Sequence, residues 1–144
     1  MSIMYNAARR RFANGELKWD SALKVLLLHP TYAPVATHEF VSSVAAHECS
    51  GPGCVGGFGA SGRKLITASV VQDDALNRAV LSFGALVWRG INAGIVGKLV
   101  VVRERSSDAT SWLVALLDGP GFPVTTSGGV LTVDPTTTAA LVLE

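Results

Sequence analysis

The sequence predicts a mainly β protein: a β-sandwich or jelly-roll-like single domain over residues 1–144, with one or two short helices near the N-terminus. After Gly62, apolar and polar residues alternate with a period of two, as in strands that bury one face. Short apolar stretches then recur to the end of the chain, separated by Gly, Asn, Asp, Ser and Pro. A chain of 144 residues can bury one core, so one domain accounts for its length.

The first expected element is a short helix over residues 5–13, because Gly15 stands just beyond it in the usual C-terminal cap position. Its three arginines are consecutive, and its two aromatic residues are seven positions apart and share one helical face. We therefore predict that residues 1–14 form a docking segment outside the core. The predicted interface residues are Tyr5, Arg9, Arg10, Arg11 and Phe12. The alternative is that the two aromatic residues cover the β-sheets while the arginines are solvated.

Three elements are expected before the β series. Residues 22–28, "ALKVLLL", are nearly all apolar and predict a strand that ends before a proline-containing loop. Thr37 can cap a short helix over residues 38–44, with Glu39 in the first turn, where the helix dipole favours an acid. Residues 50–62 contain so many glycines that we expect an irregular loop there.

The β series begins with a predicted hairpin. "RKLITASVVQ" (63–72) and "NRAVLSF" (77–83) both alternate, and "DDAL" joins them as a turn. The further strand-like stretches are "LVWRG", "IVGKLVVVRE", "SWLVALLD", "GGVLTVD" and "TAALVLE". Within the second of these, "KLVVVRE" (98–104) is apolar on both faces, so we expect it to be a central strand.

The composition is unusually apolar for a soluble monomer. Charged residues make up 16% of the chain and hydrophobic residues 49%, against about 25% and 45–50% in typical domains. No apolar run approaches the ~20 residues that a membrane-spanning helix requires, so we expect no membrane partner. The apolar excess must be core, or a surface that another protein covers, and it predicts a homo-oligomer.

The charges are unevenly distributed. With 12 basic and 7 acidic residues, positions 1–105 carry +5, whereas positions 106–144 carry four acidic residues and no basic one, for a total of +1. A near-neutral total with ends of opposite sign argues against nucleic acid as a partner. The start of the chain has no apolar stretch of a secretory leader, so we expect synthesis in the cytoplasm and reduced cysteines.

The stretch "THEFVSSVAAHEC" (37–49) raises the question of a metal or hydrolase site. A zinc protease motif needs His-Glu-x-x-His on one helix, but His29, His38 and His47 are nine residues apart. Cys49 and Cys54 are separated by five positions and have no second pair, unlike common zinc ligands. We therefore predict no catalytic residue, no metal and no cofactor.

The glycine-rich stretch also contains "GFGASG" (57–62), which matches the dinucleotide pattern G-x-G-x-x-G. That pattern binds phosphate only between a strand and a helix, where the helix N-terminus faces the phosphate groups. Here the residues after Gly62 alternate as in a strand. We therefore predict that this stretch does not bind a nucleotide.

The order of several motifs resembles a family of small virion structural proteins of tailed bacteriophages. The matching motifs are "FANGELKWDSALKVLLLHPTYAP", "THEFVSSVAAHECSGPG", "RKLITASVV", "LVWRG" and "GGVLTVD". The resemblance extends from about Phe12 to Glu144. Cys49 and Cys54 stand where members commonly carry an aliphatic and an aromatic residue, so the resemblance implies no role for the thiols.

The resemblance implies a β-rich structural protein of the particle, a capsid decoration or cement protein, with the major capsid protein or other virion proteins as partners. A trimer is the expected homo-oligomer if the protein covers three-fold positions of a shell. The expected location is the virion, after synthesis in the host cytoplasm. The alternatives are a head-to-tail junction or tail protein and, from a different class, a metal-dependent hydrolase using His38, His47 and a cysteine.

Overall fold

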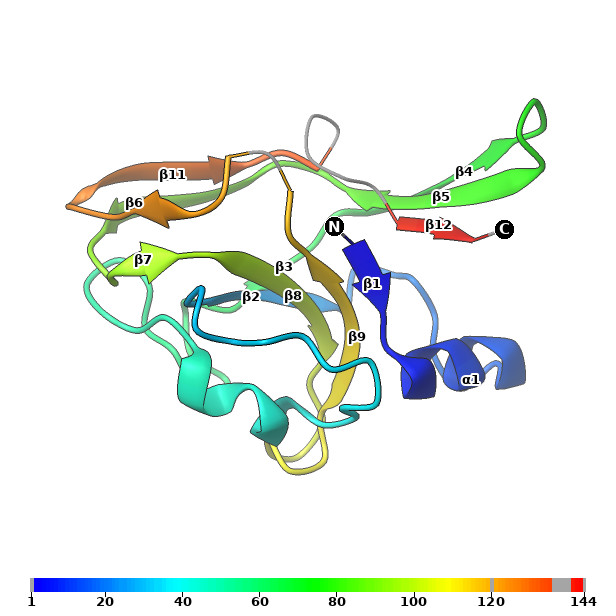
Figure 1. The fold of residues 1–144 in the computed structure, drawn as a ribbon, viewed down its shortest axis with the longest axis horizontal. Coiled ribbons are helices and arrows are strands. Elements are labelled where there is room, and N and C mark those ends of the chain that lie inside the picture. Colours follow the sequence, from blue (N-terminus) through cyan, green and yellow to red (C-terminus); the bar gives the residue numbers. More distant parts are fainter. Residues whose placement is uncertain (1, 120, 136–140, 144) are drawn as a thin grey trace.

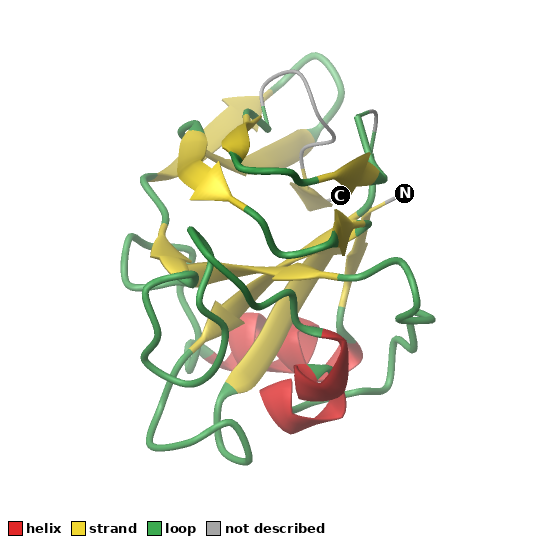
Figure 2. Ribbon diagram, turned by 90° about the vertical axis from the view of Figure 1, so that its left-hand side faces the viewer, coloured by secondary structure: helices red, strands yellow, loops and turns green. Residues whose placement is uncertain are grey.

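The computed structural model describes residues 2–119, 121–135 and 141–143. It is mainly β, with one α-helix near the N-terminus and several antiparallel sheets, so the predicted fold class is confirmed. Figure 1 shows one layer of strands lying over another, and Figure 2 shows the helices on the opposite side of the lower layer.

The elements in chain order are β1 (Ser2–Met4), α1 (Asn6–Asn14), β2 (Lys24–Leu28), the 3-10 helices η1 (Val41–Ser43) and η2 (Ala45–His47), β3 (Lys64–Leu65), β4 (Ala68–Asp73), β5 (Arg78–Phe83), β6 (Leu86–Ile91), β7 (Ile95–Val96), β8 (Lys98–Arg103), β9 (Trp112–Leu117), β10 (Val124–Thr125), β11 (Gly129–Val133) and β12 (Leu141–Leu143).

The lower layer contains a five-stranded antiparallel sheet in the order β1-β9-β8-β2-β3, which we call the body sheet. Strand β8 lies between β9 and β2, as predicted from its two apolar faces. Residues 99–102 of β8 and 113–116 of β9 are fully buried. Apolar side chains on both faces of these strands therefore form the centre of the core.

The upper layer is formed around β5 and β6, which follow each other with Gly84 and Ala85 between them. β5 pairs with β4 and β12, and β6 pairs with β11, all antiparallel. Trp88 of β6 is fully buried, and its indole N–H donates to the carbonyl of Gly62, 3.0 Å away. The indole N–H of Trp19 donates to the carbonyl of Ser82 at 2.8 Å. These two bonds satisfy the polar ends of large apolar side chains and tie loops to the upper layer.

Several predicted elements are confirmed. The helix predicted over 5–13 is α1, and Gly15 ends it in the left-handed conformation, with φ of +74°. The strand predicted over 22–28 is β2, and residues 50–62 form no helix or strand. The predicted hairpin is formed by β4 and β5, which pair from Ala68 with Phe83 to Asp73 with Arg78.

Two predicted strands are each divided in two. "IVGKLVVVRE" breaks at Gly97 into β7 and β8 because Gly97 lies against Pro30, where an added Cβ would be only 2.5 Å from the Pro30 Cα. "RKLITASVVQ" breaks after Leu65: β3 pairs with β2 in the body sheet, and β4 pairs with β5 in the upper layer. The alternation of apolar and polar residues continues without a break from β3 to β4, so the sequence does not show that the chain passes from one layer to the other here.

The helix predicted over 38–44 is wrong. Glu39 and Phe40 lie alongside β9 instead: the amide of Leu113 donates to the Glu39 carbonyl at 2.9 Å, and Phe40 forms a bridge with Trp112. Two 3-10 turns follow, and Thr37 caps neither of them. Residues 39 and 40 pair with the edge of β9 instead of forming the helix that Thr37 could cap, because backbone groups at a buried edge need hydrogen-bond partners.

The prediction that residues 1–14 lie outside the core is also wrong. Residues 2–4 form β1, which the sequence did not reveal, and β1 pairs with β9 at the edge of the body sheet. Tyr5 and Ala8 are fully buried. The segment covers an exposed sheet edge and packs the apolar side of α1 on β9, so its removal would open the core. The alternative, in which the aromatic residues cover the β-sheets, holds for Tyr5.

Candidate docking surfaces

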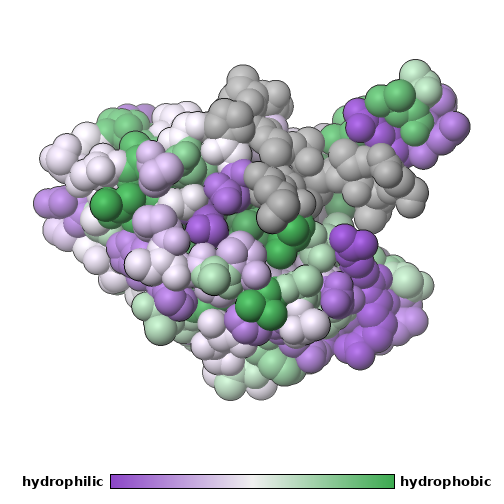
Figure 3. Space-filling model, viewed as in Figure 1, coloured by the Kyte–Doolittle hydropathy of each residue, from purple (hydrophilic) through white to green (hydrophobic). Residues whose placement is uncertain are grey.

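The predicted interface residues divide between the core and the surface. Tyr5 and Arg11 are buried, Phe12 is half-buried, and Arg9 and Arg10 are exposed. The region around α1 is correspondingly hydrophilic in Figure 3. Two adjacent positive side chains on a helix whose other side is fixed to the sheet form a rigid basic surface, which we call the α1 face.

The buried arginine of α1 fixes this helix to the body. The guanidinium of Arg11 pairs with the Glu39 carboxylate and stacks on Trp112, with its carbon 4.2 Å from the ring centroid. The guanidinium carbon of Arg105 lies 4.4 Å from the same ring centroid. Trp112 is therefore contacted by two cations, an arrangement that stabilises each by cation–π attraction. Arg10 adds a longer contact of 3.6 Å to Glu39.

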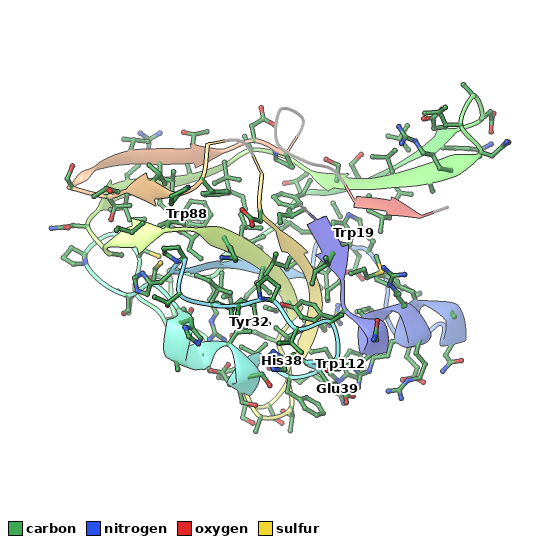
Figure 4. The ribbon with its side chains drawn as sticks, in the orientation of Figure 1. Trp19, Tyr32, His38, Glu39, Trp88 and Trp112 are labelled. Atoms are coloured by element: carbon green, nitrogen blue, oxygen red, sulfur yellow. The ribbon has the colours of Figure 1, made fainter. Side chains whose placement is uncertain are left out.

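Two of the three histidines flank one tyrosine. The Tyr32 hydroxyl lies 3.2 Å from the Tyr5 hydroxyl and 3.0 Å from Nδ1 of His38. The His47 ring is 5.6 Å from the Tyr32 ring, and its Nδ1 lies 3.0 Å from the Thr31 hydroxyl. Figure 4 shows His38 beside Tyr32. Burial and the Tyr32 hydrogen bond raise the pKa of Tyr5, so its phenol stays protonated and the group serves as a structural network.

The third histidine lies beside a cysteine without forming a catalytic pair. Nδ1 of His29 is 3.4 Å from Sγ of Cys49 and 2.8 Å from the carbonyl oxygen of Ile95. A carbonyl can only accept, so Nδ1 carries the proton and cannot take one from the thiol. Burial, with the charges of Cys54 and Glu48, raises the pKa of Cys49 to about 12. The thiol is therefore protonated at neutral pH and a poor nucleophile.

A buried arginine organises the largest charged cluster. The Arg63 side chain is fully buried and donates to Glu48 at 2.7 and 2.9 Å, to Asp108 at 2.7 and 3.2 Å and to Glu104 at 3.0 Å. Lys24 pairs with Glu104 from the other side, at 2.5 Å. Burial opposes the Arg63 charge, but the hydrogen bonds to Glu48 and Asp108 outweigh it and raise the pKa of Arg63.

The same carboxylates hold the glycine-rich loop. The backbone N–H of Gly57 donates to Glu48 at 3.2 Å, and that of Gly59 donates to Glu104 at 2.9 Å. In a nucleotide site such N–H groups would bind phosphate. Here the protein's own acids occupy them, and the loop leads into β3 rather than a helix. The cluster therefore has a structural role that the sequence could not reveal.

The described ranges contain no metal site, no helix that could span a membrane and no disulfide. Among residues 2–119, 121–135 and 141–143, no three His, Cys, Asp or Glu side chains lie where they could hold a metal ion. The helices of these ranges are all too short or too polar to cross a bilayer. Cys49 and Cys54 are unbridged.

The turn end of the β4–β5 hairpin, residues 68–83, projects from the rest of the molecule, and we call this hairpin the arm (Figure 1). Val70 and Val71 are 56% and 55% exposed, and Leu76 at the turn is 60% exposed. Successive residues of a strand point to opposite faces, so both faces of the arm present apolar side chains to solvent. β4 is also the edge strand of its three-stranded sheet.

The β6–β11 pair lies at the other end of the long axis from the arm (Figure 1), and residues in and near these two strands line a hollow. We call it the groove, and its volume is about 230 Å³. It is lined by Ile91, Val124, Thr125, Thr126, Ser127, Gly129, Val130 and Leu131. Val130 is 60% exposed and is paired across the strands with the exposed Arg89. Paired residues lie on the same face of a sheet, so the positive charge of Arg89 lies beside Val130 at the margin of the groove.

Comparison of the chain with protein-family models, with curated proteins and with solved structures found no match.

Proposed function

We propose that this chain is a structural component of a bacteriophage particle, specifically a capsid decoration or cement protein that stabilises the shell through protein–protein contacts. The observation that carries the proposal is the arm, which projects beyond the body with apolar side chains on both faces. A soluble domain gains nothing from such an element alone, whereas an assembly protein buries it against a neighbour. The motifs of residues 12–144 support the same function class.

The internal chemistry supports a structural role as well. The groups that could react are engaged in holding the fold: Cys49 is a buried, protonated thiol, and His29 donates to a backbone carbonyl. Arg63 is saturated by carboxylates. The buried Cys49 thiol and the carboxylate-bound Arg63 guanidinium therefore stabilise the fold and are not available to a substrate.

The α1 face is the surface proposed to meet the shell. Arg9 and Arg10 would attract an acidic surface of the major capsid protein, and half-buried Phe12 would add apolar contact. The contacts of Tyr5 and Arg11 with the body already hold this helix in place. Binding would therefore cost little conformational entropy.

A head-to-tail junction or tail protein is the second candidate, since an adhesive arm also serves those positions. Copy number separates the two. A decoration protein repeats with the icosahedral shell and reaches on the order of hundreds of copies per particle, whereas a junction or tail component follows a single axis.

The test uses particles purified on a density gradient from cells that carry this gene. The proposal predicts that the chain co-purifies with filled particles at the copy number of a shell protein, measured by quantitative mass spectrometry. A chain that stays entirely with the unassembled cellular protein would contradict it. A low copy number would instead favour the junction or tail.

The α1 face is tested on particles assembled without this chain. The variant Arg9→Gln with Arg10→Gln should bind these particles at least about fivefold more weakly, because the loss of ~1 kcal/mol of attraction changes affinity by that factor. Lys64→Gln with Lys98→Gln loses the same charge elsewhere and should bind like the unchanged chain. Equal weakening in both variants would contradict a specific role of α1.

A further inference from the structure

Exposed apolar residues concentrate at the two ends of the molecule. In the described ranges the five most exposed large apolar side chains are Leu76, Val130, Leu65, Val70 and Val71, each more than half exposed. Three of them lie on the arm, and Val130 lines the groove at the opposite end. The two sites are different surfaces, and one chain cannot bring its own arm to its own groove without losing its fold.

The arm ends in an apolar side chain and a free negative charge. Leu76 stands in the turn between β4 and β5. Asp73 is paired with Arg78, its Oδ2 2.9 Å from the guanidinium Nε. Asp74 contacts only the side-chain amide of Gln72 among the described residues. The end of the arm therefore presents a leucine beside a carboxylate without a paired cation among the described residues. Figure 3 shows hydrophobic and hydrophilic residues side by side at this tip.

The margin of the groove carries an exposed apolar residue and a positive charge, which are complementary to the tip of the arm. Its walls are mixed, with apolar and hydroxyl side chains in similar number, and the exposed Val130 stands at its margin. Arg89, directly across from Val130 in the strand register, is exposed and has no ion-pair partner in the part of the chain that the structure describes. A groove margin with the exposed Val130 beside a free positive charge matches an apolar tip beside a free negative charge.

We propose that the arm of one copy docks in the groove of a second copy, with Leu76 against Val130 and Asp74 near Arg89. This inference rests on the proposed assembly function. Because the two surfaces differ, the contact is head-to-tail, and repeated contacts close into a ring when the rotation between neighbours allows it. A ring of three is the closed form that would match a three-fold position of a shell.

Docking between two copies gives a reason for the apolar side chains on the arm, because it would remove them from water. Burying a leucine or valine side chain that is exposed to water stabilises a complex through the hydrophobic effect. Leu76 and Val130 would gain such burial from each other, since each is 60% exposed within its own chain. The charge pair beside them adds little energy but sets the direction in which the arm enters.

The test pairs variants of the purified protein that each carry one added, exposed cysteine, while the native Cys49 and Cys54 are buried. Leu76→Cys and Val130→Cys chains are mixed under mild oxidation and separated on non-reducing gels. The proposal predicts a disulfide-linked dimer in the mixture, several-fold more abundant than in either variant alone. The matched control mixes Leu76→Cys with Leu65→Cys, whose position on β3 is equally exposed but lies on the other layer. A mixture that yields no more dimer than this control would overturn the proposal.

Charge reversal provides the second measurement, by sedimentation of the same purified protein. Asp74→Arg and Arg89→Asp should each weaken self-association at least about fivefold, the factor that ~1 kcal/mol represents. The double variant restores opposite charges at the contact and should regain association. If the double variant remains as weak as the singles, the arm does not face Arg89 and the inference fails.

These outcomes are independent of the particle experiment. Self-association through arm and groove without any presence in particles would contradict the proposed function alone. Presence in particles with no arm-to-groove cross-link would contradict the inference alone.

Discussion

Two valine-rich strands of this protein, β8 and β4, differ in how far their valine side chains are buried. In β8, Val100, Val101 and Val102 are fully buried, because β9 and β2 pair on either side and other residues cover both faces. In β4, Val70 and Val71 are more than half exposed on the free edge of the arm. The residue type is the same, and so is the intrinsic preference for a strand. The difference is that other residues of the chain cover the valines of β8 completely and those of β4 only in part.

The difference shows that this apolar composition serves two purposes. In the body it stabilises the fold, where each buried side chain contributes through the hydrophobic effect. At the outer end of the arm, Val70, Val71 and Leu76 are more than half exposed and bury little surface within the monomer, so we expect them to contact another molecule. Changes in the body should therefore affect unfolding, and changes in the arm should affect association.

Deleting residues 1–14 should have the largest effect on folding. It removes β1 and the buried side chains of Tyr5 and Ala8, and it uncovers the edge of β9. We expect the truncated chain to lose cooperative thermal unfolding, measured by circular dichroism. The matched control replaces residues 72–79 of the arm with Asn-Gly and should unfold cooperatively. A truncated chain with near-native thermal stability would restore the idea of a separate docking segment.

Replacing the buried guanidinium should have the next largest effect. Arg63→Met leaves Glu48, Glu104 and Asp108 without their shared cation, and breaking a buried ion pair typically costs about 3–5 kcal/mol. We expect a loss of that size in the free energy of unfolding, measured in urea. Arg89→Met, at an exposed site, should change it by no more than about 0.5 kcal/mol. Similar small changes in both variants would show that the cluster does not hold the body together.

A matched pair of leucines tests the comparison itself. Leu99 of β8 is fully buried, whereas Leu76 of the arm is 60% exposed. Leu99→Ala should lower the free energy of unfolding by about 2–5 kcal/mol, and Leu76→Ala should change it by about 0.5 kcal/mol or less. Urea unfolding of the two variants at low protein concentration measures both. Equal losses would mean that the arm packs on its own body.

The smallest expected effect is on how the free energy of unfolding depends on acidic pH, through Glu104. Burial works against ionisation of Glu104, but hydrogen bonds from Gly59, Lys24 and Arg63 outweigh it and lower its pKa. A carboxyl whose pKa is lower in the folded state stabilises the fold above its ordinary pKa, about 4.3. That stability is lost as the pH falls through the folded pKa.

Glu104→Gln should therefore unfold with a shallower dependence on pH below about 4.3 than the unchanged chain, even though its stability at neutral pH is lower. Denaturant midpoints measured across the acidic range give the two slopes. Parallel slopes would mean that Glu104 has no part in the acid response.

The parts of the fold that the sequence predicted are those set by local signals. Gly15 ended α1 because a left-handed residue was needed there. The period of two marked β4 and β5, and apolar residues on both faces marked β8 as central. Each of these depends on residues close together in the chain.

The parts that were missed depend on distant residues. The Arg63 cluster joins positions 48, 104 and 108, and no spacing rule connects them. His38 and His47 are nine residues apart, yet both contact Tyr32 because the chain turns around it. The burial of Met4, Tyr5 and Ala8 followed from a free edge on β9, which becomes visible only when the sheet is assembled.

The most direct test of the contrast between body and arm is sedimentation velocity over a wide range of protein concentration, comparing the unchanged chain with Leu76→Asp. Leu65→Asp, at an equally exposed site on β3, serves as the control. We predict that the unchanged chain and the control sediment as assemblies at high concentration, while Leu76→Asp remains a single folded chain. If the unchanged chain remains a single chain throughout, or if Leu76→Asp assembles as the control does, the arm is not the contact surface.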